Sequence, residues 1–285
     1  MIGRHPLAKL GIYGLLGIGL IVAVIPIAWT ILTSLKPARQ TFALPPVFMF
    51  MPTLESYLAL FGRRADLGYR AVDINFWFYM RNSLVAAVGS TLLTLGVSSL
   101  AAYGLSRFYF RGKRLITFAI ISTRMLPPIG AVVPLFLVMH EANLLDTHIG
   151  LILVYTAFNI PLAVWMLRGF MDELPKELDE AALIDGCSRF GVAARIILPL
   201  IGPGLGATAV FSFLLCWNDF AIAFVLTSRA ATTLPVIVLS FIVEEGVMWG
   251  QMSAAVTCAM LPAVVLLVLA QRHMVKGLTM GAVKG

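Results

Sequence analysis

Two apolar stretches of the sequence carry residues of types that can bind a polar ligand. Trp217, Asn218 and Asp219 are consecutive, and Asn159 lies in another apolar stretch. An indole ring stacks on the apolar face of a ligand, while amide and carboxylate groups are planar partners for its hydroxyls. A hydrogen bond between neighbouring helices is the alternative role for each of the four. The residue types therefore predict candidate pathway contacts and leave the structural role open.

A single charged residue, Arg124, stands inside the apolar stretch 115–139. A charge at the bilayer centre costs roughly 2.5–3.5 kcal/mol on insertion scales, so its side chain should face protein or a water-filled cavity. We expect either a residue of a transport pathway or one member of an ion pair. Pro127, Pro128 and Pro134 interrupt the same stretch, which indicates a kink or a broken helix beside a cavity.

No group of residues in the sequence indicates catalysis. His140 and His148 are eight positions apart rather than the four of a zinc-binding helix, and the three cysteines have neither metal nor disulfide spacing. The one Gly-Lys pair, Gly112 and Lys113, continues with Arg114 and so lacks the Ser or Thr of a phosphate-binding loop. We expect no enzymatic activity, no metal and no cofactor on this chain.

The composition is that of a membrane protein. Of the 285 residues, 60% are hydrophobic and 12% are charged, whereas soluble domains average about 45–50% and 25%. A soluble domain of this length has too little interior to bury so much apolar surface, which excludes a soluble enzyme. The formal net charge of +7 is attributed to basic loops at a membrane rather than to nucleic-acid binding. We expect one transmembrane domain over residues 1–285.

Six apolar stretches are long enough to cross a bilayer, which takes about 20 residues of helix. They are 10–35, 82–106, 115–139, 147–167, 196–218 and 246–271, and we expect the helix of 196–218 to continue past Asp219. The shorter stretch 230–243 contains Pro235 and is expected to be re-entrant or interfacial. The predicted fold is therefore all-α, with six transmembrane helices.

The basic residues predict the orientation of these six helices. Most Lys and Arg residues fall in the loops that lie in the cytoplasm when both termini are placed there. The long loop 36–76 is then extracytoplasmic, whereas the polar loop 171–199 and the tail 273–285 are cytoplasmic. We expect a multi-pass protein of the bacterial cytoplasmic (inner) membrane.

The loop 171–199 has the local signals of two short helices. Pro175 suits a first helical turn, and acidic residues follow it, where they favour the helix dipole. Gly186 can supply the left-handed residue that stops the first helix, and Ser188 can cap a second helix that Pro199 ends. Small residues at the turn would let another protein approach closely, although an ordinary solvated hairpin is the alternative.

The same loop resembles the EAA motif of permease subunits of binding-protein-dependent ABC importers. The residues that carry the resemblance, or belong to the implied ATPase-coupling surface, are Glu180, Ala181, Ala182, Asp185, Gly186, Phe190, Ile196, Leu198 and Pro199. Residues 33–37, the Trp217–Asp219 segment and the tail 276–285 are similar to carbohydrate permeases of the maltose type. The resemblance covers essentially the whole chain.

The resemblance implies a subunit that forms half of a translocation pathway for a sugar or sugar derivative. Its implied partners are a second permease subunit in a heterodimer, two ABC ATPase subunits and an extracytoplasmic solute-binding protein. The ATPases would bind ATP and Mg and would receive the EAA helices, called coupling helices, in surface grooves. Alternating access would follow from ATP binding and hydrolysis there, because each ligand favours one of two states.

Two positions depart from the motif, and two other functions stay open. Cys187 stands where Ala is usual, and Ala193 stands where an aromatic residue is common, for which Phe190 can compensate. A stand-alone secondary transporter or channel needs acidic residues in the membrane, and the six stretches offer only Asp219. An ABC permease for a non-sugar solute is the closer alternative.

Overall fold

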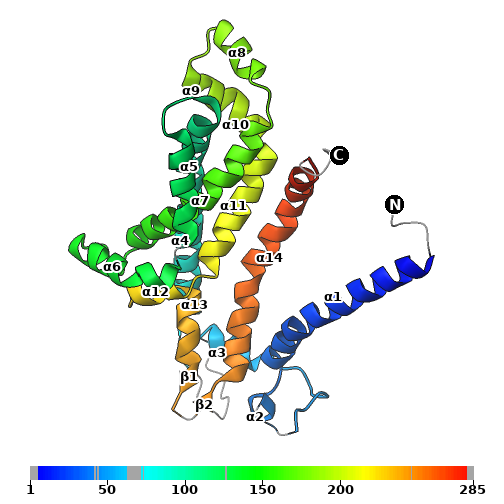
Figure 1. The fold of residues 1–285 in the computed structure, drawn as a ribbon. Coiled ribbons are helices and arrows are strands. Elements are labelled where there is room, and N and C mark those ends of the chain that lie inside the picture. Colours follow the sequence, from blue (N-terminus) through cyan, green and yellow to red (C-terminus); the bar gives the residue numbers. More distant parts are fainter. Residues whose placement is uncertain are drawn as a thin grey trace. The chain divides into compact units, whose positions relative to one another are not determined.

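The computed structural model describes residues 6–41, 43, 45–62, 72, 74–125, 127–244 and 246–280 (Figure 1). The chain is mostly helical. It divides into two compact units, Met1–Trp77 with Val238–Leu261 and Phe78–Ile237 with Pro262–Gly285.

The first unit holds a long apolar helix and several short elements. Helix α1 spans Pro6–Ser34, α2 Ala38–Thr41 and α3 Glu55–Leu60, and β1 (Ile242–Val243) pairs antiparallel with β2 (Gly246–Val247). The hydroxyls of Ser34 and Tyr57 lie 2.7 Å apart and join α1 to the segment of α3. Most of the described side chains of α1 are exposed although they are apolar, so lipid or another chain must cover them.

The second unit is built on α4 (Phe76–Arg107), α7 (His148–Asp172) and α11 (Gly202–Trp217). Small hydroxyl residues are buried along these helices, including Ser90, Thr156 and Ser212. The Thr156 hydroxyl donates to the Ser90 carbonyl at 3.4 Å. Such small polar residues let helix backbones approach closely. Their hydroxyl groups also form hydrogen bonds between helices in an apolar medium.

Six spans are not seen as six straight helices. Among the described residues, four helices are long and apolar enough to cross a membrane: α1, α4, α7 and α14 (Trp249–Met280). The count reaches six if each of two bent pairs is one span. The stretch 230–243 contains only the short helices α13 (Leu234–Ile237) and η3 (Val238–Phe241) before β1, and neither is long enough to cross.

The stretch 115–139 is broken rather than straight. It forms α5 (Lys113–Ser122), the 3-10 turn η1 (Thr123–Met125) and α6 (Pro128–Glu141), and the two arms are bent by 100°. Proline lacks a backbone donor and disfavours helix in the residue before it. Pro127 is extended, with ψ of 129°, and α6 begins after it. Of the two alternatives for the prolines, the structure shows the broken helix.

The stretch 196–218 is also divided. Its first residues belong to an arm made of α9 (Arg189–Val192), the π-turn η2 (Ala193–Ile197) and α10 (Leu198–Leu200), bent by 80° from α11. Pro199 lies inside α10 and does not end the helix, because a proline is tolerated in a first turn. The break falls at Ile201 instead.

A loop at one end of the second unit closes around one carboxylate. Asp146 accepts hydrogen bonds from the backbone N–H groups of residues 228–231, which follow α12 (Ala221–Leu226). Burial raises the pKa of Asp146, but these four donors outweigh it and lower the pKa to about 2. In Figure 1, α6 and α12 lie at this end of the unit, and α8 (Glu177–Ile184) lies at the other.

Candidate functional site

The polar loop after α7 folds as the two short helices that its sequence predicts. Helix α8 carries Glu177, Asp179 and Glu180 in its first turn, where acids favour the helix dipole. Pro175 precedes the helix instead of lying in its first turn, because α8 begins at Glu177 after an N-cap at Lys176. This start is two residues later than the sequence suggests.

The turn between the two helices has the predicted backbone. Gly186 has a φ of +86°, a left-handed conformation that side chains with a Cβ rarely adopt. The N–H of Cys187 donates to the carbonyl of Ala182 at 3.0 Å, which closes the end of α8. The Ser188 hydroxyl accepts from the N–H of Gly191 at 3.1 Å and caps α9. Both local predictions are confirmed.

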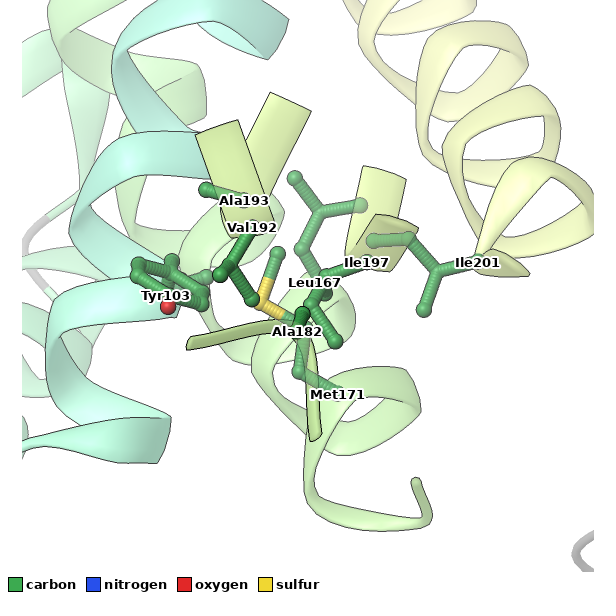
Figure 2. Close-up of a cluster of buried hydrophobic side chains, with 9 residues drawn as sticks. Tyr103, Leu167, Met171, Ala182, Val192, Ala193, Ile197 and Ile201 are labelled. Atoms are coloured by element: carbon green, nitrogen blue, oxygen red, sulfur yellow. The ribbon is translucent and has the colours of Figure 1, made fainter. Parts of the chain in front are cut away.

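One face of this loop is anchored in the chain's own core. Figure 2 shows Ala182, Val192, Ala193 and Ile197 gathered with side chains from α4 and α7. The cluster is Tyr103, Leu167, Met171, Ala182, Val192, Ala193, Ile197 and Ile201, with Ala102. Ile196 and Leu198 are partly buried against it. Thus Ala193 is an internal packing residue here, 3% exposed within the cluster.

A buried ion pair adds a polar contact to this anchor. The Arg107 Nε lies 2.9 Å from the Asp179 Oδ2, and the two side chains are only 6% and 12% exposed. The Tyr103 hydroxyl donates to the other carboxylate oxygen at 3.3 Å. The sequence does not predict this pair. Its only local signals are an acid in the first turn of α8, Asp179, and an arginine at the end of α4, Arg107. It fixes α8 to the last turns of α4.

The opposite face of the loop is open. Glu180, Ala181, Asp185 and Gly186 are exposed. Phe190 is 69% exposed and Ile184 is 86% exposed, which is high for large apolar side chains. Pro199 is exposed on the second arm. The motif residues thus separate into an inner set held by α4 and α7 and an outer set available to another protein.

Two candidate pathway residues, Asn159 and Trp217, make contacts inside the second unit. The Asn159 amide is buried and donates to the Ser212 carbonyl at 3.4 Å and to the Cys216 sulfur at 3.0 Å, which joins α7 to α11. Trp217 is buried and stacks on Phe213 with ring centroids 5.4 Å apart. The Asn159 geometry matches the alternative of a hydrogen bond between helices, whereas the stacking contact of Trp217 lies within α11.

Asp219 has a defined structural position. Helix α11 ends at Trp217, so the expected continuation past Asp219 is wrong, and a new helix, α12, begins at Ala221. One oxygen of Asp219 accepts from the Tyr155 hydroxyl and from the N–H groups of Ile222 and Ala223, all at 3.1–3.2 Å. It satisfies backbone donors that the first turn of a helix leaves free.

Arg124 and Asn218 remain exposed. Arg124 donates from Nη1 to the Phe158 carbonyl at 3.1 Å, and within the described part of the chain no carboxylate forms an ion pair with it. Asn218 donates to the Leu214 carbonyl at 2.8 Å. These are the two predicted pathway residues whose polar groups face outward.

A cavity in the first unit was not foreseen from the sequence. Lys36 is only 5% exposed, and its ammonium lies 4.5 Å from the ring centre of Trp29 and 5.5 Å from that of Phe50. The cavity beside it has a volume of about 430 Å³ and is also lined by Gln40 and Trp249. Cation–π contact holds a lysine in such surroundings without a carboxylate. The residues 33–37 were noticed only through the family resemblance.

Comparison with known proteins shows the family of this chain. Residues 93–280 match the family described as binding-protein-dependent transport system inner membrane component. The chain belongs to that family. The permease is 36% identical over 267 residues to the trehalose/maltose transport system permease protein MalG of Thermococcus litoralis, with 93% of each chain covered. It is 34% identical over 264 residues to the diacetylchitobiose uptake system permease protein DasC of Streptomyces coelicolor, with 92% of each covered.

The fold of the permease is also known from a solved structure. A chain in the crystal structure of a bacterial ABC transporter involved in the import of the acidic polysaccharide alginate matches with a TM-score of 0.76. That match covers 93% of this chain and 96% of the other at 22% identity. Together with the family, these relatives identify the chain as a permease subunit of a binding-protein-dependent ABC importer, which is a transport subunit and not an enzyme.

Proposed function

We propose that this permease forms half of the pathway of a sugar importer in the bacterial inner membrane. A second permease subunit forms the other half in a heterodimer, and two ABC ATPase subunits bind ATP and Mg. Each bent helix pair counts as one span in this proposal, so the chain crosses six times with both termini in the cytoplasm. An extracytoplasmic protein delivers the solute, and a solved relative of this fold is in complex with such a periplasmic protein.

The names of the relatives support a carbohydrate as the solute. They are permeases for trehalose or maltose, sulfoquinovosyl glycerol and diacetylchitobiose, each at least 34% identical over 92% or more of this chain. Arg124 and Asn218 present polar groups outward and are the residues that we propose for the pathway. A non-sugar solute is the alternative within the same class.

The observation that carries the proposal is the two-sided loop between α7 and α11. Its inner face is buried on α4 and α7, while the outer face presents Glu180, Asp185, Phe190 and Ile184. An exposed aromatic beside small residues is the composition of a protein-docking surface. A pull on this surface by an ATPase subunit would pass directly to α4 and α7. The outer set is therefore the proposed coupling site.

The experiment is ATP-driven uptake by a variant of the turn. Gly186→Leu should abolish uptake while the protein is still made and inserted, because a Cβ at φ +86° reshapes the docking surface. Gly62→Leu is the matched control, since Gly62 has a φ of +76° and equally open space but lies far from the coupling loop in sequence. Normal uptake by the Gly186 variant would refute the coupling role.

A further inference from the structure

A cationic groove lies where α4, α5 and α7 meet at their ends. It is an open space of about 1050 Å³, lined by Arg111, Lys113, Arg114 and Arg168 together with apolar side chains. Within the described chain, none of the residues that line it is acidic. The groove therefore presents positive charge to whatever occupies it.

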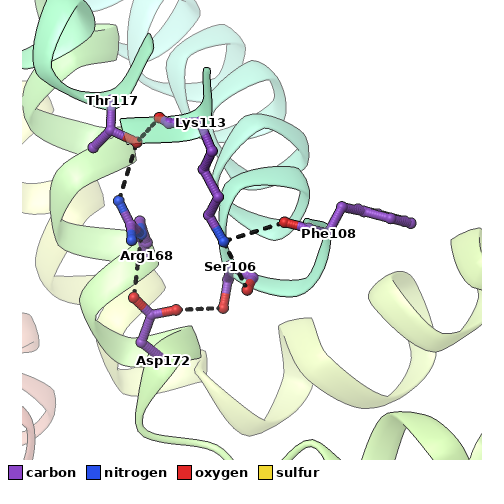
Figure 3. A network of polar contacts seen from close by, with 6 residues as sticks. All are labelled: Ser106, Phe108, Lys113, Thr117, Arg168 and Asp172. Carbon is purple, nitrogen blue, oxygen red and sulfur yellow. Dashed lines mark hydrogen bonds and ion pairs between the residues drawn. The ribbon is translucent and has the colours of Figure 1, made fainter. Parts of the chain in front are cut away.

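Two of the four cations are held in place by the protein. Figure 3 shows Arg168 between two helices, where its Nε contacts Asp172 at 3.2 Å and its Nη1 donates to the Thr117 hydroxyl at 3.2 Å. The Lys113 ammonium donates to the Phe108 carbonyl at 3.2 Å, and the Ser106 hydroxyl donates to Asp172 at 2.6 Å. This network fixes one wall of the groove.

The other two cations are free to bind a ligand. Arg111 and Arg114 are exposed, and no carboxylate of the described residues pairs with either guanidinium. Guanidinium groups form paired hydrogen bonds with phosphate oxygens, so two of them that line one groove suit a phosphate ester.

The remaining lining is apolar and continues away from the charges. Leu115 is 71% exposed and Phe118 is 67% exposed, on the side of α5 that borders the groove. A second, smaller cavity of about 230 Å³ shares Thr117, Ile121 and Arg168 with the groove and runs between α5 and α7. Its lining is mostly apolar, and its one acid, Asp172, is already bonded to Arg168 and Ser106. A charged mouth beside a largely apolar cleft matches a molecule with an anionic head and a hydrocarbon tail.

The position along the helices favours a membrane lipid. The cations stand just beyond the last residue of α4 and beside the last turn of α7, two helices that are long and apolar enough to span a bilayer. Basic residues at such helix ends lie at headgroup depth. We propose that the groove is a binding site for one anionic phospholipid, with Arg111 and Arg114 on the phosphate and Leu115, Phe118 and the α5–α7 cleft on the acyl chain.

The test is lipid binding to the purified intact importer, measured by native mass spectrometry. The probes are phosphatidylglycerol and phosphatidylcholine with identical acyl chains, and water-soluble glycerophosphoglycerol for the headgroup alone. Each basic residue near a membrane surface contributes about 1 kcal/mol to such binding. Arg111→Gln with Arg114→Gln should therefore weaken phosphatidylglycerol binding about 10- to 30-fold, and should weaken phosphatidylcholine binding much less, because the choline cation already neutralises the phosphate of that lipid.

The matched control removes two exposed arginines at the other end of the unit, Arg81→Gln with Arg229→Gln. It should retain wild-type phosphatidylglycerol binding, and the mass of the intact complex reports assembly in the same spectrum. Equal losses in both double variants would overturn the site, since only net charge would then matter. No preference for phosphatidylglycerol in the wild type, or equal binding of the headgroup alone, would overturn it as well. The lipid site does not depend on which solute is imported.

Discussion

Asp146 illustrates how one side chain can organise a loop distant in sequence. Its carboxylate receives four backbone donors from residues 228–231, and its own N–H donates to the Leu226 carbonyl at 2.8 Å. Asn and Ala cannot replace this arrangement, since an amide has only one accepting oxygen and a methyl group has none.

The lowered pKa of Asp146 gives a pH-dependent prediction. The folded carboxyl has a pKa of about 2, against 3.8 for an unperturbed aspartate, so its stabilisation is present above about pH 4 and is lost as pH falls towards 2. Asp146→Ala should lower the thermal midpoint by about 2–4 °C at pH 7, a contribution of roughly 1 kcal/mol for a partly exposed group. The difference from wild type should shrink between pH 4 and pH 2 in detergent.

Glu141→Ala serves as the control for Asp146, because Glu141 is exposed and lies near the same loop. Its thermal midpoint should follow that of the wild type at each pH. A difference between Asp146→Ala and wild type that grows on acidification would contradict the assigned bonds.

The buried pair of Arg107 and Asp179 gives a second residue-scale prediction. Removal of one partner from a buried ion pair costs about 3–5 kcal/mol, because the other charge is left without compensation. Arg107→Met should therefore release α8 from α4, raise hydrogen exchange in α8 and reduce ATP-driven uptake.

The matched experiment for that pair replaces both partners. Arg107→Met with Asp179→Leu should recover much of the lost protection in α8, since no unpaired charge then remains. Greater loss in the double variant than in the single one would show that the two side chains do not act as a pair. Arg195→Met, an exposed arginine in the same loop, should leave exchange in α8 unchanged.

At the scale of elements, the second arm of the coupling loop depends on a small side chain. Ala193 is 3% exposed within the cluster of Figure 2. Extra volume in a packed core costs about 1–3 kcal/mol. Ala193→Phe should therefore lower the thermal midpoint of the importer and loosen η2, whereas Ala194→Phe, at an exposed neighbouring position, should be nearly neutral. A more stable Ala193 variant would show that the site has room for the aromatic residue common in the family.

Local signals predicted the elements of the coupling loop, and tertiary contacts decided the rest. Gly186 and Ser188 act through their own backbone neighbourhood, so the sequence was sufficient for the turn and the second cap. The roles of Asn159 and Asp219 depend on Ser212, Cys216 and Tyr155, which lie 53 or more residues away. Residue type alone cannot distinguish such partners from a transported ligand.

Helix breaks were the least predictable elements. The sequence indicates a possible break at Pro127. At the bend at Ile201, Pro199 lies inside α10, while Gly202 and Pro203 begin α11 directly after the break. The hydrophobic pattern does not change at Ile201, since both arms are apolar. The Gly202-Pro203 pair is the local signal for the break, and Ile197 and Ile201 on either side of it pack in one cluster with side chains of α4 and α7.

At the scale of the whole molecule, the chain leaves much of its apolar surface without internal partners. Leu10, Leu15 and Leu20 of α1 are each at least 65% exposed, as is Ile129 of α6. Exposure of this extent requires lipid or other subunits. Purification from native membranes in mild detergent should therefore recover this chain with a second permease and a P-loop ATPase, as mass spectrometry of the bound proteins would show. A chain that purifies alone and moves solute in liposomes without ATP would contradict the importer assembly.

The exposure of α1 also bears on the biosynthesis of the protein. Its apolar part, Lys9–Ser34, is 26 residues long, and none of the residues in its most hydrophobic segment is buried. A helix of that kind can partition into lipid as soon as it leaves the ribosome, without waiting for later segments. The helices α4, α7 and α11 carry buried polar groups that bond to one another across helices, such as Thr156 to Ser90 and Asn159 to Ser212. Insertion of the first helix is therefore independent, whereas the later helices must assemble together before the protein is complete.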